Sequence, residues 1–396
     1  MSGRRSHGLV GALALTQTVG WGVLYYVFGV FLEPMSVELG ISTATSAGAF
    51  SVAVLVSGVL SIPVGRWVDA HGAHLLMTAG SLLASVGVVV WSQVQTVPQL
   101  YAVFVLIGAA SAMVLYGPAF AVLVAVLEPR RRAKGLLAVT LAAGLASTIF
   151  IPLSAWLIEG VGWRDALVIL GLGHNLITVP LHGIVLWRTE VPKMPAGRRD
   201  RARDESVRRA LRDPGFWMIT AAFVFHGAAV TVVAVHLVLF LMDLGYRPTV
   251  AAGLTGLLGI CSISGRLVIS ALGRWLDESS ITARLFLLQG IAIAALPIVG
   301  DHPLGAAVCI DIFGLGFGVA AITTPAILIS RYGADRYATV AGVLSTPTMI
   351  ARAFAPLGGA LLAVAVGYRM MMIPVAVVCF AAGICLSLSR RLPVVR

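Results

Sequence analysis

The sequence predicts an all-α membrane protein with twelve transmembrane helices in two pseudo-symmetric six-helix bundles. Three observations lead to this prediction. The chain carries too little charge for a surface in water, its apolar runs are as long as a bilayer is thick, and short motifs of its first half return in its second half. Together they indicate a chain whose main solvent is lipid.

The composition excludes a soluble enzyme. Of the 396 residues, 59% are hydrophobic and only 11% are charged, and the mean hydropathy is +0.95. A soluble domain is about 25% charged because its surface faces water. The four cysteines fall inside apolar runs, without the spacing of a metal or redox site, and are interpreted as small core residues.

No nucleotide-binding loop is present in the sequence. The only lysines are Lys134 and Lys193, and neither follows a glycine, so the phosphate-binding Gly-x-x-x-x-Gly-Lys-Ser/Thr pattern does not occur. We therefore expect no cofactor and no enzymatic activity, and we expect any work to be driven by a gradient or a partner.

Hydropathy places twelve apolar segments along the chain. Each is close to or above the ~20 residues that span a bilayer, and only helices satisfy their own backbone there. The first run is too long for a signal peptide. We predict a bundle over 1–187, a cytoplasmic linker over 188–214 and a bundle over 215–396. The predicted helices are 9–32, 43–66, 74–92, 98–126, 135–158, 165–187, 215–242, 249–273, 281–299, 303–329, 338–364 and 370–389.

The basic residues predict the orientation. Of the 28 lysines and arginines, only Arg164, Arg247 and Arg369 fall in loops on one side, whereas the linker and the loops on the other side hold almost all the rest. The positive-inside rule then places both termini in the cytoplasm of a multi-pass protein of the cytoplasmic membrane. The net charge of +11 is thus interpreted as a topology signal, not as a nucleic-acid-binding surface.

Three short motifs repeat at nearly the same offset. This relates helices 2, 5 and the 5–6 loop to helices 8, 11 and the 11–12 loop, as expected for two parallel halves. The matching pairs are Gly65–Asp69 with Gly273–Asp277, Phe150–Leu153 with Phe354–Leu357, and Gly162–Arg164 with Gly367–Arg369.

The segment GRWVDAHG after helix 2 resembles the Gly-x-x-x-Asp-Arg-x-Gly signature of the major facilitator transporters, with Gly65, Asp69 and Gly72 in place and Ala70 where that family has a basic residue. The resemblance covers essentially the whole chain and implies a secondary carrier. In that family the motif latches helices at the cytoplasmic face. We therefore expect Asp69, Asp277 and Arg131 to act at a gate, and not as substrate ligands.

A narrower resemblance is to the monocarboxylate-transporter and oxalate:formate-antiporter branch. It rests on YYVFGVFLEPMSVELG in helix 1, RRRAKG before helix 5, GWR after it and GRLVISALGRWLD in helix 8. Two features depart from the monocarboxylate carriers. Ser262 stands where they have an acid, and their helix 1 lysine has no equivalent.

Two arginines, Arg266 in helix 8 and Arg352 in helix 11, lie well inside predicted spans. A central arginine costs about 2.5–3.5 kcal/mol on insertion scales, which disfavours a lipid-facing position. The planar guanidinium suits a carboxylate. In the resembling branch the helix 8 arginine anchors the substrate anion and oxalate antiporters carry a cation in helix 11, so both residues are predicted substrate ligands. The alternative is that Arg266 snorkels or binds a carbonyl near the cytoplasmic side.

Asp311 in helix 10 and His226 in helix 7 are the candidates for proton coupling. If Asp311 pairs with an arginine, the cavity keeps one positive charge and suits a monoanion. If Asp311 is remote, two cations favour a dianion. A buried histidine bonded to a carbonyl is the structural alternative for His226, and His174 and His182 of helix 6 are expected to pack.

Three tyrosines are predicted to shape the pocket: Tyr25 and Tyr26 in helix 1 and Tyr116 in helix 4. Oxalate antiporters similarly enclose their anion with aromatics from helices 1 and 4. Adjacent helical residues point about 100° apart, so only one of the first two can face a cavity squarely. Tyr116-Gly117-Pro118 predicts a local break in helix 4.

The sequence thus predicts alternating-access transport of a small organic anion, a mono- or dicarboxylate, by proton symport or anion antiport. The expected partners are the anion, protons or a counter-anion, and the lipid bilayer, with the monomer as the functional unit and no nucleic acid. The alternative is an exporter of amphipathic drugs or metabolites, which predicts acids, not arginines, in the cavity.

Overall fold

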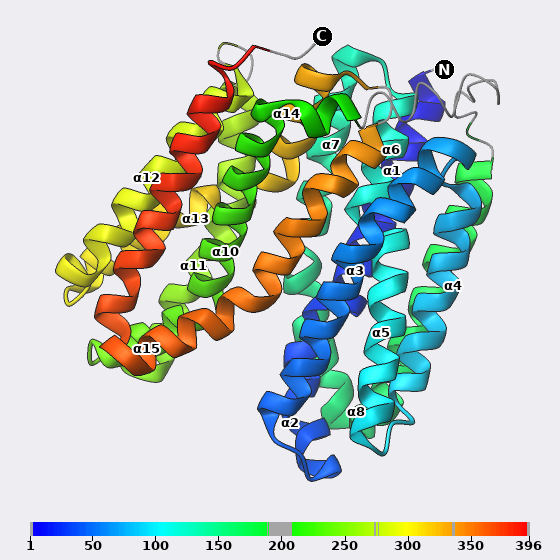
Figure 1. Ribbon diagram of the computed structural model, residues 1–396. Coiled ribbons are helices and arrows are strands. Elements are labelled where there is room, and N and C mark those ends of the chain that lie inside the picture. Colours follow the sequence, from blue (N-terminus) through cyan, green and yellow to red (C-terminus); the bar gives the residue numbers. More distant parts are fainter. Residues whose placement is uncertain are drawn as a thin grey trace. The chain divides into compact units, whose positions relative to one another are not determined.

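The computed structural model describes residues 3–187, 189, 208–272, 275, 277–334 and 337–393. Apart from short turns, these residues are helical throughout (Figure 1). Most of the predicted linker lies outside the described residues, although 208–212 are helical.

The helices follow the predicted apolar runs closely. Those before the linker are α1 (Gly3–Trp21), η1 (Gly22–Tyr26), α2 (Phe28–Leu39), α3 (Thr43–His71), α4 (His74–Trp91), α5 (Val97–Val114), α6 (Tyr116–Val126), α7 (Pro129–Gly144), α8 (Ala146–Pro180) and η2 (Leu181–Val185), where η marks a π-helical turn. Those after it are α10 (Pro214–Asp243), α11 (Pro248–Leu272), α12 (Glu278–Val299), α13 (Pro303–Phe317), α14 (Ala320–Tyr332) and α15 (Tyr337–Ser389).

Two of these helices are pairs of spans joined at a glycine. Gly162 in α8 has φ 79° and ψ 164°, and Gly367 in α15 has φ 82° and ψ 161°. A residue with a Cβ rarely adopts such a positive φ, so glycine permits the sharp reversal at both sites. Figure 1 shows α15 changing direction there. The two glycines are the ones that the sequence repeat aligned, so their equivalence is confirmed in the backbone.

The described helices account for twelve passes. Eight segments are long and apolar enough to cross a membrane, or nine if the bent pair α13–α14 is one span, and a shorter apolar helix covers Gly253–Ile269. Two of the eight, Pro129–Val185 and Tyr337–Ser389, contain the glycine reversals and cross twice. The predicted all-α membrane fold is confirmed.

The chain forms two compact units. Unit 1 comprises Met1–Arg203 with Gly333–Thr346, and unit 2 comprises Asp204–Tyr332 with Pro347–Arg396. The first turns of α15 therefore pack with the N-terminal half of the chain, and Pro347 begins the part that packs with the C-terminal half. The predicted bundle boundaries at 187 and 215 remain a prediction.

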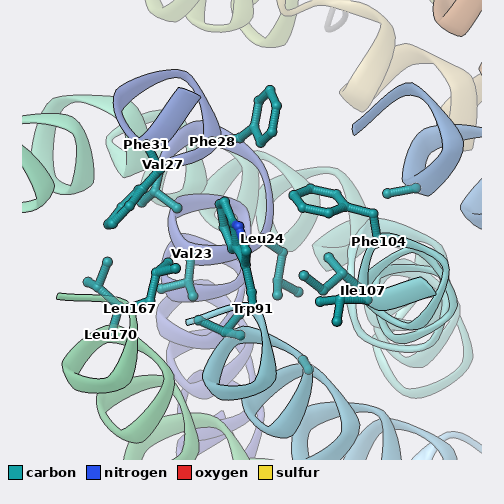
Figure 2. Close-up of a cluster of buried hydrophobic side chains, with 14 of the residues drawn as sticks. Val23, Leu24, Val27, Phe28, Phe31, Trp91, Phe104, Ile107, Leu167 and Leu170 are labelled. Atoms are coloured by element: carbon teal, nitrogen blue, oxygen red, sulfur yellow. The ribbon is translucent and has the colours of Figure 1, made fainter. Parts of the chain in front are cut away.

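Aromatic and branched side chains fill the core of unit 1 (Figure 2). Trp91 of α4 is at its centre, with ring centroids 5.0 Å from Phe104 of α5 and 5.6 Å from Phe31 of α2. Its indole N–H donates to the Met35 sulfur at 3.1 Å. This core packs α2 against α4 and α5.

Two spans are broken near their middles. In unit 1, Leu115 adopts an extended conformation (φ −77°, ψ −161°) between α5 and α6, which confirms the break predicted at Tyr116-Gly117-Pro118. In unit 2, α13 and α14 meet at a bend of 42° around Gly318. Broken helices in membranes expose backbone groups that neighbouring side chains must satisfy.

Candidate functional site

Arg266 of α11 is buried, with 9% of its surface exposed, and binds the break between α13 and α14. Its Nε donates to the Gly318 carbonyl at 3.2 Å and its Nη2 to the Ser262 hydroxyl at 3.4 Å. In an unbroken helix that carbonyl would accept from the Ile322 N–H, which bonds Val319 instead. The break therefore creates the acceptor that orients the guanidinium.

Glycine at position 318 is required by this contact. A Cβ there would lie 2.5 Å from Arg266 Nε and 2.2 Å from the Ser262 hydroxyl oxygen. Arg266 thus binds a backbone carbonyl, as the alternative to anion binding predicted. That carbonyl belongs to the middle of a broken span and does not lie at the end of α11. Its predicted role in anion binding remains a prediction.

Arg352 of α15 is half-buried and packs on α10 within unit 2. A Cβ at Gly227 would lie 3.2 Å from Arg352 Cγ, so the aliphatic stem of the arginine rests directly on the α10 backbone. Pro347 and Pro356 flank it inside the helix. Both predicted cations therefore belong to the same unit.

His226 of α10 is buried next to the contact between Arg352 and Gly227. Its ring stacks on Phe286 of α12, with centroids 4.0 Å apart and planes at 15°, and it neighbours Gln289 and Gly316. Among the described atoms, its Nε2 has no hydrogen-bond partner. The imidazole thus faces the contact of α12 with α13.

Asp311 of α13 accepts a hydrogen bond from the Cys261 thiol of α11 at 3.3 Å. Cys261 is on the same helix as Arg266, five residues earlier, which is about 7.5 Å along the axis. The Asp311 carboxylate and the Arg266 guanidinium therefore make their contacts at different positions along α11.

The three predicted tyrosines gather around Trp21 in unit 1. Its ring centroid lies 5.3 Å from Tyr25, 6.5 Å from Tyr26 and 4.9 Å from Tyr116. The π-helical turn η1 carries both helix 1 tyrosines, and Tyr25 is 37% exposed whereas Tyr26 is half-buried. The structure thus brings these predicted residues together, and it adds Trp21, which lies within Gly20-Trp21-Gly22 of the sequence.

The predicted gate residues have three different environments. Asp69 accepts from the Thr339 backbone N–H at 2.8 Å and from the Thr339 hydroxyl at 2.5 Å, both within unit 1. Arg131 is exposed and its Nη1 donates to the Ser6 hydroxyl at 3.5 Å. Asp277, in unit 2, caps its own helix α12 through the Ser280 N–H at 3.0 Å.

The seam between α3 and the start of α15 is very close. A Cβ at Gly65 would lie 2.3 Å from the Ala338 carbonyl oxygen, and the Thr346 hydroxyl donates to the Gly58 carbonyl at 2.7 Å. Gly65 is part of the signature that precedes Asp69. The motif therefore provides both the aspartate that binds Thr339 and the glycine that lets α15 approach α3 closely.

A buried ion pair in unit 2 was not anticipated from the sequence. Asp213, before α10, accepts from Arg331 Nε at 2.9 Å and from the Tyr332 hydroxyl at 2.6 Å, and its side chain is fully buried. Burial alone would raise the pKa of this carboxyl, but hydrogen bonds from Arg331, Tyr332 and the Gly215 N–H hold that pKa below its usual value. The only sequence signal was a helix-capping Asp-Pro dipeptide.

The described residues contain no group of three or more histidine, cysteine or acidic side chains arranged to hold a metal ion. What the arrangement offers instead is two arginines in one unit, an aromatic cluster in the other, and backbone carbonyls freed at helix breaks. Together with the candidate spans, these features indicate a polytopic membrane protein with polar groups inside its helical units.

The chain belongs to the Major Facilitator Superfamily, whose family model matches residues 12–356. It is therefore a secondary transporter and not an enzyme. Its fold resembles the solved structures of the Escherichia coli fucose:proton symporter (TM-score 0.74, 14% identity, 96% of this chain and 98% of that chain) and of the human organic anion transporter MFSD10 (TM-score 0.67, 16% identity, 98% and 100%).

Curated relatives share about a quarter of their residues with the chain. Monocarboxylate transporter 4 of Gallus gallus is 25% identical over 86% of this chain and 75% of its own length. An MFS-type efflux pump of Mycolicibacterium smegmatis is 29% identical over 80% and 74%. The oxalate:formate antiporter of Oxalobacter formigenes is 26% identical over 50% and 47%. The resemblance to the monocarboxylate and oxalate branch is thus confirmed as distant homology.

Proposed function

We propose that this transporter moves a small organic anion, a mono- or dicarboxylate, across the cytoplasmic membrane by alternating access. The observation that carries the proposal is Arg266: a guanidinium that is buried within unit 2 and oriented by the carbonyl of a broken span. A buried cation of this kind is costly in a membrane protein, and such residues are therefore rare and usually functional. Relatives named as monocarboxylate transporters and an oxalate:formate antiporter support the substrate class.

Arg352 is the second anion ligand of this proposal, and Tyr25, Tyr26 and Tyr116 form the aromatic wall. Both arginines belong to unit 2, and the tyrosines belong to unit 1. Asp311 is hydrogen bonded to a thiol, which supports the alternative in which its charge does not neutralise an arginine and the substrate is a dicarboxylate.

The transport cycle follows from charge. When the site is empty, its uncompensated positive charge opposes the switch between the two facing states of the carrier. A bound anion neutralises this charge and relieves that cost. Protons for symport would be carried by Asp311 or His226; without them, exchange of one anion for another is the mode. Asp69, with Asp277 and Arg131, would control the gate, and both termini would lie in the cytoplasm. The monomer is the proposed functional unit.

The test is counterflow in proteoliposomes after a thermal-shift screen of the purified protein against oxalate, malonate, succinate, lactate and acetate across pH. Arg266→Gln and Arg352→Gln are each expected to reduce counterflow of the best ligand at least about tenfold, since a charge-assisted hydrogen bond contributes about 1.5–3 kcal/mol. Arg369→Gln, which removes an exposed arginine paired with Asp301, is the matched control. Undiminished counterflow in both cavity variants would refute the proposal.

The alternative is export of amphipathic drugs or metabolites by proton antiport, which the efflux-pump relative favours. In that case a lipophilic cation such as ethidium would be transported by the proteoliposomes, carboxylates would give no thermal shift, and Asp311→Asn would abolish transport whereas Arg266→Gln would not.

A further inference from the structure

Both broken spans are held by a buried glutamine from another helix. In unit 1, Gln17 of α1 donates through Nε2 to the Val114 carbonyl at 2.7 Å. In unit 2, Gln289 of α12 donates through Nε2 to the Phe313 carbonyl at 2.8 Å. Each glutamine has 0% exposed surface. Each also has an Oε1 without a hydrogen-bond partner among the described atoms.

The unit 1 contact follows from the chemistry of proline. Pro118 has no N–H, so the carbonyl four residues earlier, that of Val114, loses its helical donor. An unsatisfied carbonyl in the apolar interior would cost several kcal/mol. Gln17 supplies the missing donor. Because Tyr116 lies between Val114 and Pro118, this bond fixes the backbone from which the tyrosine projects toward Trp21.

The unit 2 contact braces the last turn of α13 before the bend. A Cβ at Gly316 would lie 2.3 Å from Gln289 Cδ, so the amide lies flat against the α13 backbone where only glycine fits. Two residues later the Gly318 carbonyl receives Arg266 from α11. The break is therefore gripped by Gln289 from α12 and by Arg266 from α11.

We propose that Gln17 and Gln289 are positioning residues for the substrate site: each holds a helix break in the geometry that presents a substrate ligand, Tyr116 in unit 1 and Arg266 in unit 2. This inference rests on the proposed function, because it takes these two residues as ligands of the anion.

The test compares Gln17→Met and Gln289→Met with wild type in the counterflow assay, using the carboxylate with the largest thermal shift. Methionine keeps the length and removes the donor. Each variant is expected to raise the KM about three- to tenfold, as loss of one buried hydrogen bond predicts, with Vmax changed less than about twofold.

Matched controls lie on the same helices. Thr18→Val on α1 and Thr282→Val on α12 each remove a buried hydroxyl that bonds only its own helix, to Ala14 at 2.8 Å and to Glu278 at 2.6 Å. Both should leave the KM unchanged. Gly316→Ala should also raise the KM, because its Cβ would displace the Gln289 amide.

Gln289→Glu separates positioning from packing. A protonated carboxylic acid can donate to the Phe313 carbonyl, whereas a carboxylate cannot. The variant should therefore have a KM near that of wild type at low pH and an increasing KM as the pH rises, relative to wild type at each pH. A KM that stays raised by the same factor at every pH would contradict the donor role.

The two proposals fail differently. If the arginine variants lose counterflow while Gln17→Met and Gln289→Met match the threonine controls in KM, the positioning role is wrong and the anion site stands. If the glutamine variants lower Vmax at constant KM, the positioning role is also wrong. If the arginine variants transport normally, the anion site itself is wrong.

Discussion

The two copies of the Gly-Arg-Trp-x-Asp motif end in aspartates with different partners. Asp69 in unit 1 caps the first turn of another helix, α15, through Thr339. Asp277 in unit 2 caps its own helix α12 and forms an ion pair with Arg390 at 3.1 Å, in which both side chains are about half exposed (50% and 47%).

In unit 2 the buried carboxylate is instead Asp213, which joins α10 to the ends of α14 and α15. Besides Asp213, Arg331 binds the Ser389 and Leu392 carbonyls at 2.9 Å and 3.3 Å. The partner supplied by other helices therefore decides whether the aspartate of this repeated motif connects two helices.

The largest effect is expected at Asp213. Asp213→Ala leaves the Arg331 charge buried and unpaired, which costs about 3–5 kcal/mol in free energy of unfolding. Denaturant unfolding of the purified protein measures this. Since the pKa of Asp213 is lowered in the fold, its contribution is complete above the unfolded pKa of about 3.9 and is lost as the pH falls through the folded pKa. A loss of unfolding free energy below about 1 kcal/mol would contradict a stabilising buried ion pair between Asp213 and Arg331.

Gly65→Ala should have the next largest effect. Its Cβ would collide with the Ala338 carbonyl, and overpacking of this kind costs about 1–3 kcal/mol. We expect a lower melting temperature and slower counterflow, because the added methyl group would push the first turns of α15 away from α3. Gly117→Ala, where a Cβ meets nothing within 4 Å, is the control. Equal melting temperatures for the two variants would show that the seam is not tight.

Asp69→Ala removes the carboxylate oxygen that accepts both hydrogen bonds from Thr339, and it should cost about 1–2 kcal/mol, the upper range for loss of a helix cap. If the cap belongs to a gate, the variant should also alter the labelling rate of a cysteine introduced at the start of α15 about five- to thirtyfold, the factor that this energy represents. Thr339→Val should reproduce part of the change. An unaltered labelling rate would remove Asp69 from the gate.

The smallest effect is expected for Asp277→Ala. The exposed ion pair contributes about 0–1 kcal/mol and is screened by salt, and the exposed cap contributes about 0.5 kcal/mol, the low end for a helix cap. Raising the salt concentration should therefore change the melting temperature of the wild type and of the variant by nearly the same amount. A loss as large as that of Asp69→Ala would contradict the contrast between the two motif copies.

Local sequence predicted most of the fold. The apolar runs located the spans, Pro118 marked the break in helix 4, and the aligned Gly162 and Gly367 marked the two reversals. The expectation that His174 and His182 pack was also correct: both are buried, and their Nδ1 atoms bond the Ser85 and Ser81 hydroxyls at 2.9 Å and 2.7 Å.

The candidate site was predicted less completely. The tyrosines and arginines were identified because charged and aromatic residues are conspicuous in apolar spans. Gln17 and Gln289 were not, because an uncharged polar residue in a span has no sequence signature that names its partner. The α13–α14 break was missed as well, since glycines 314, 316 and 318 do not fix a bend by themselves.

The sequence by itself determined the class of fold, the spans, their repeat and the two reversals, because a helix in lipid satisfies its backbone within its own segment and its glycines and prolines act locally. Only the tertiary structure decided which carbonyl Gln17 reaches, which helix Asp69 caps and which break orients Arg266. These bonds join residues far apart in the chain, so their partners depend on how the helices pack against one another.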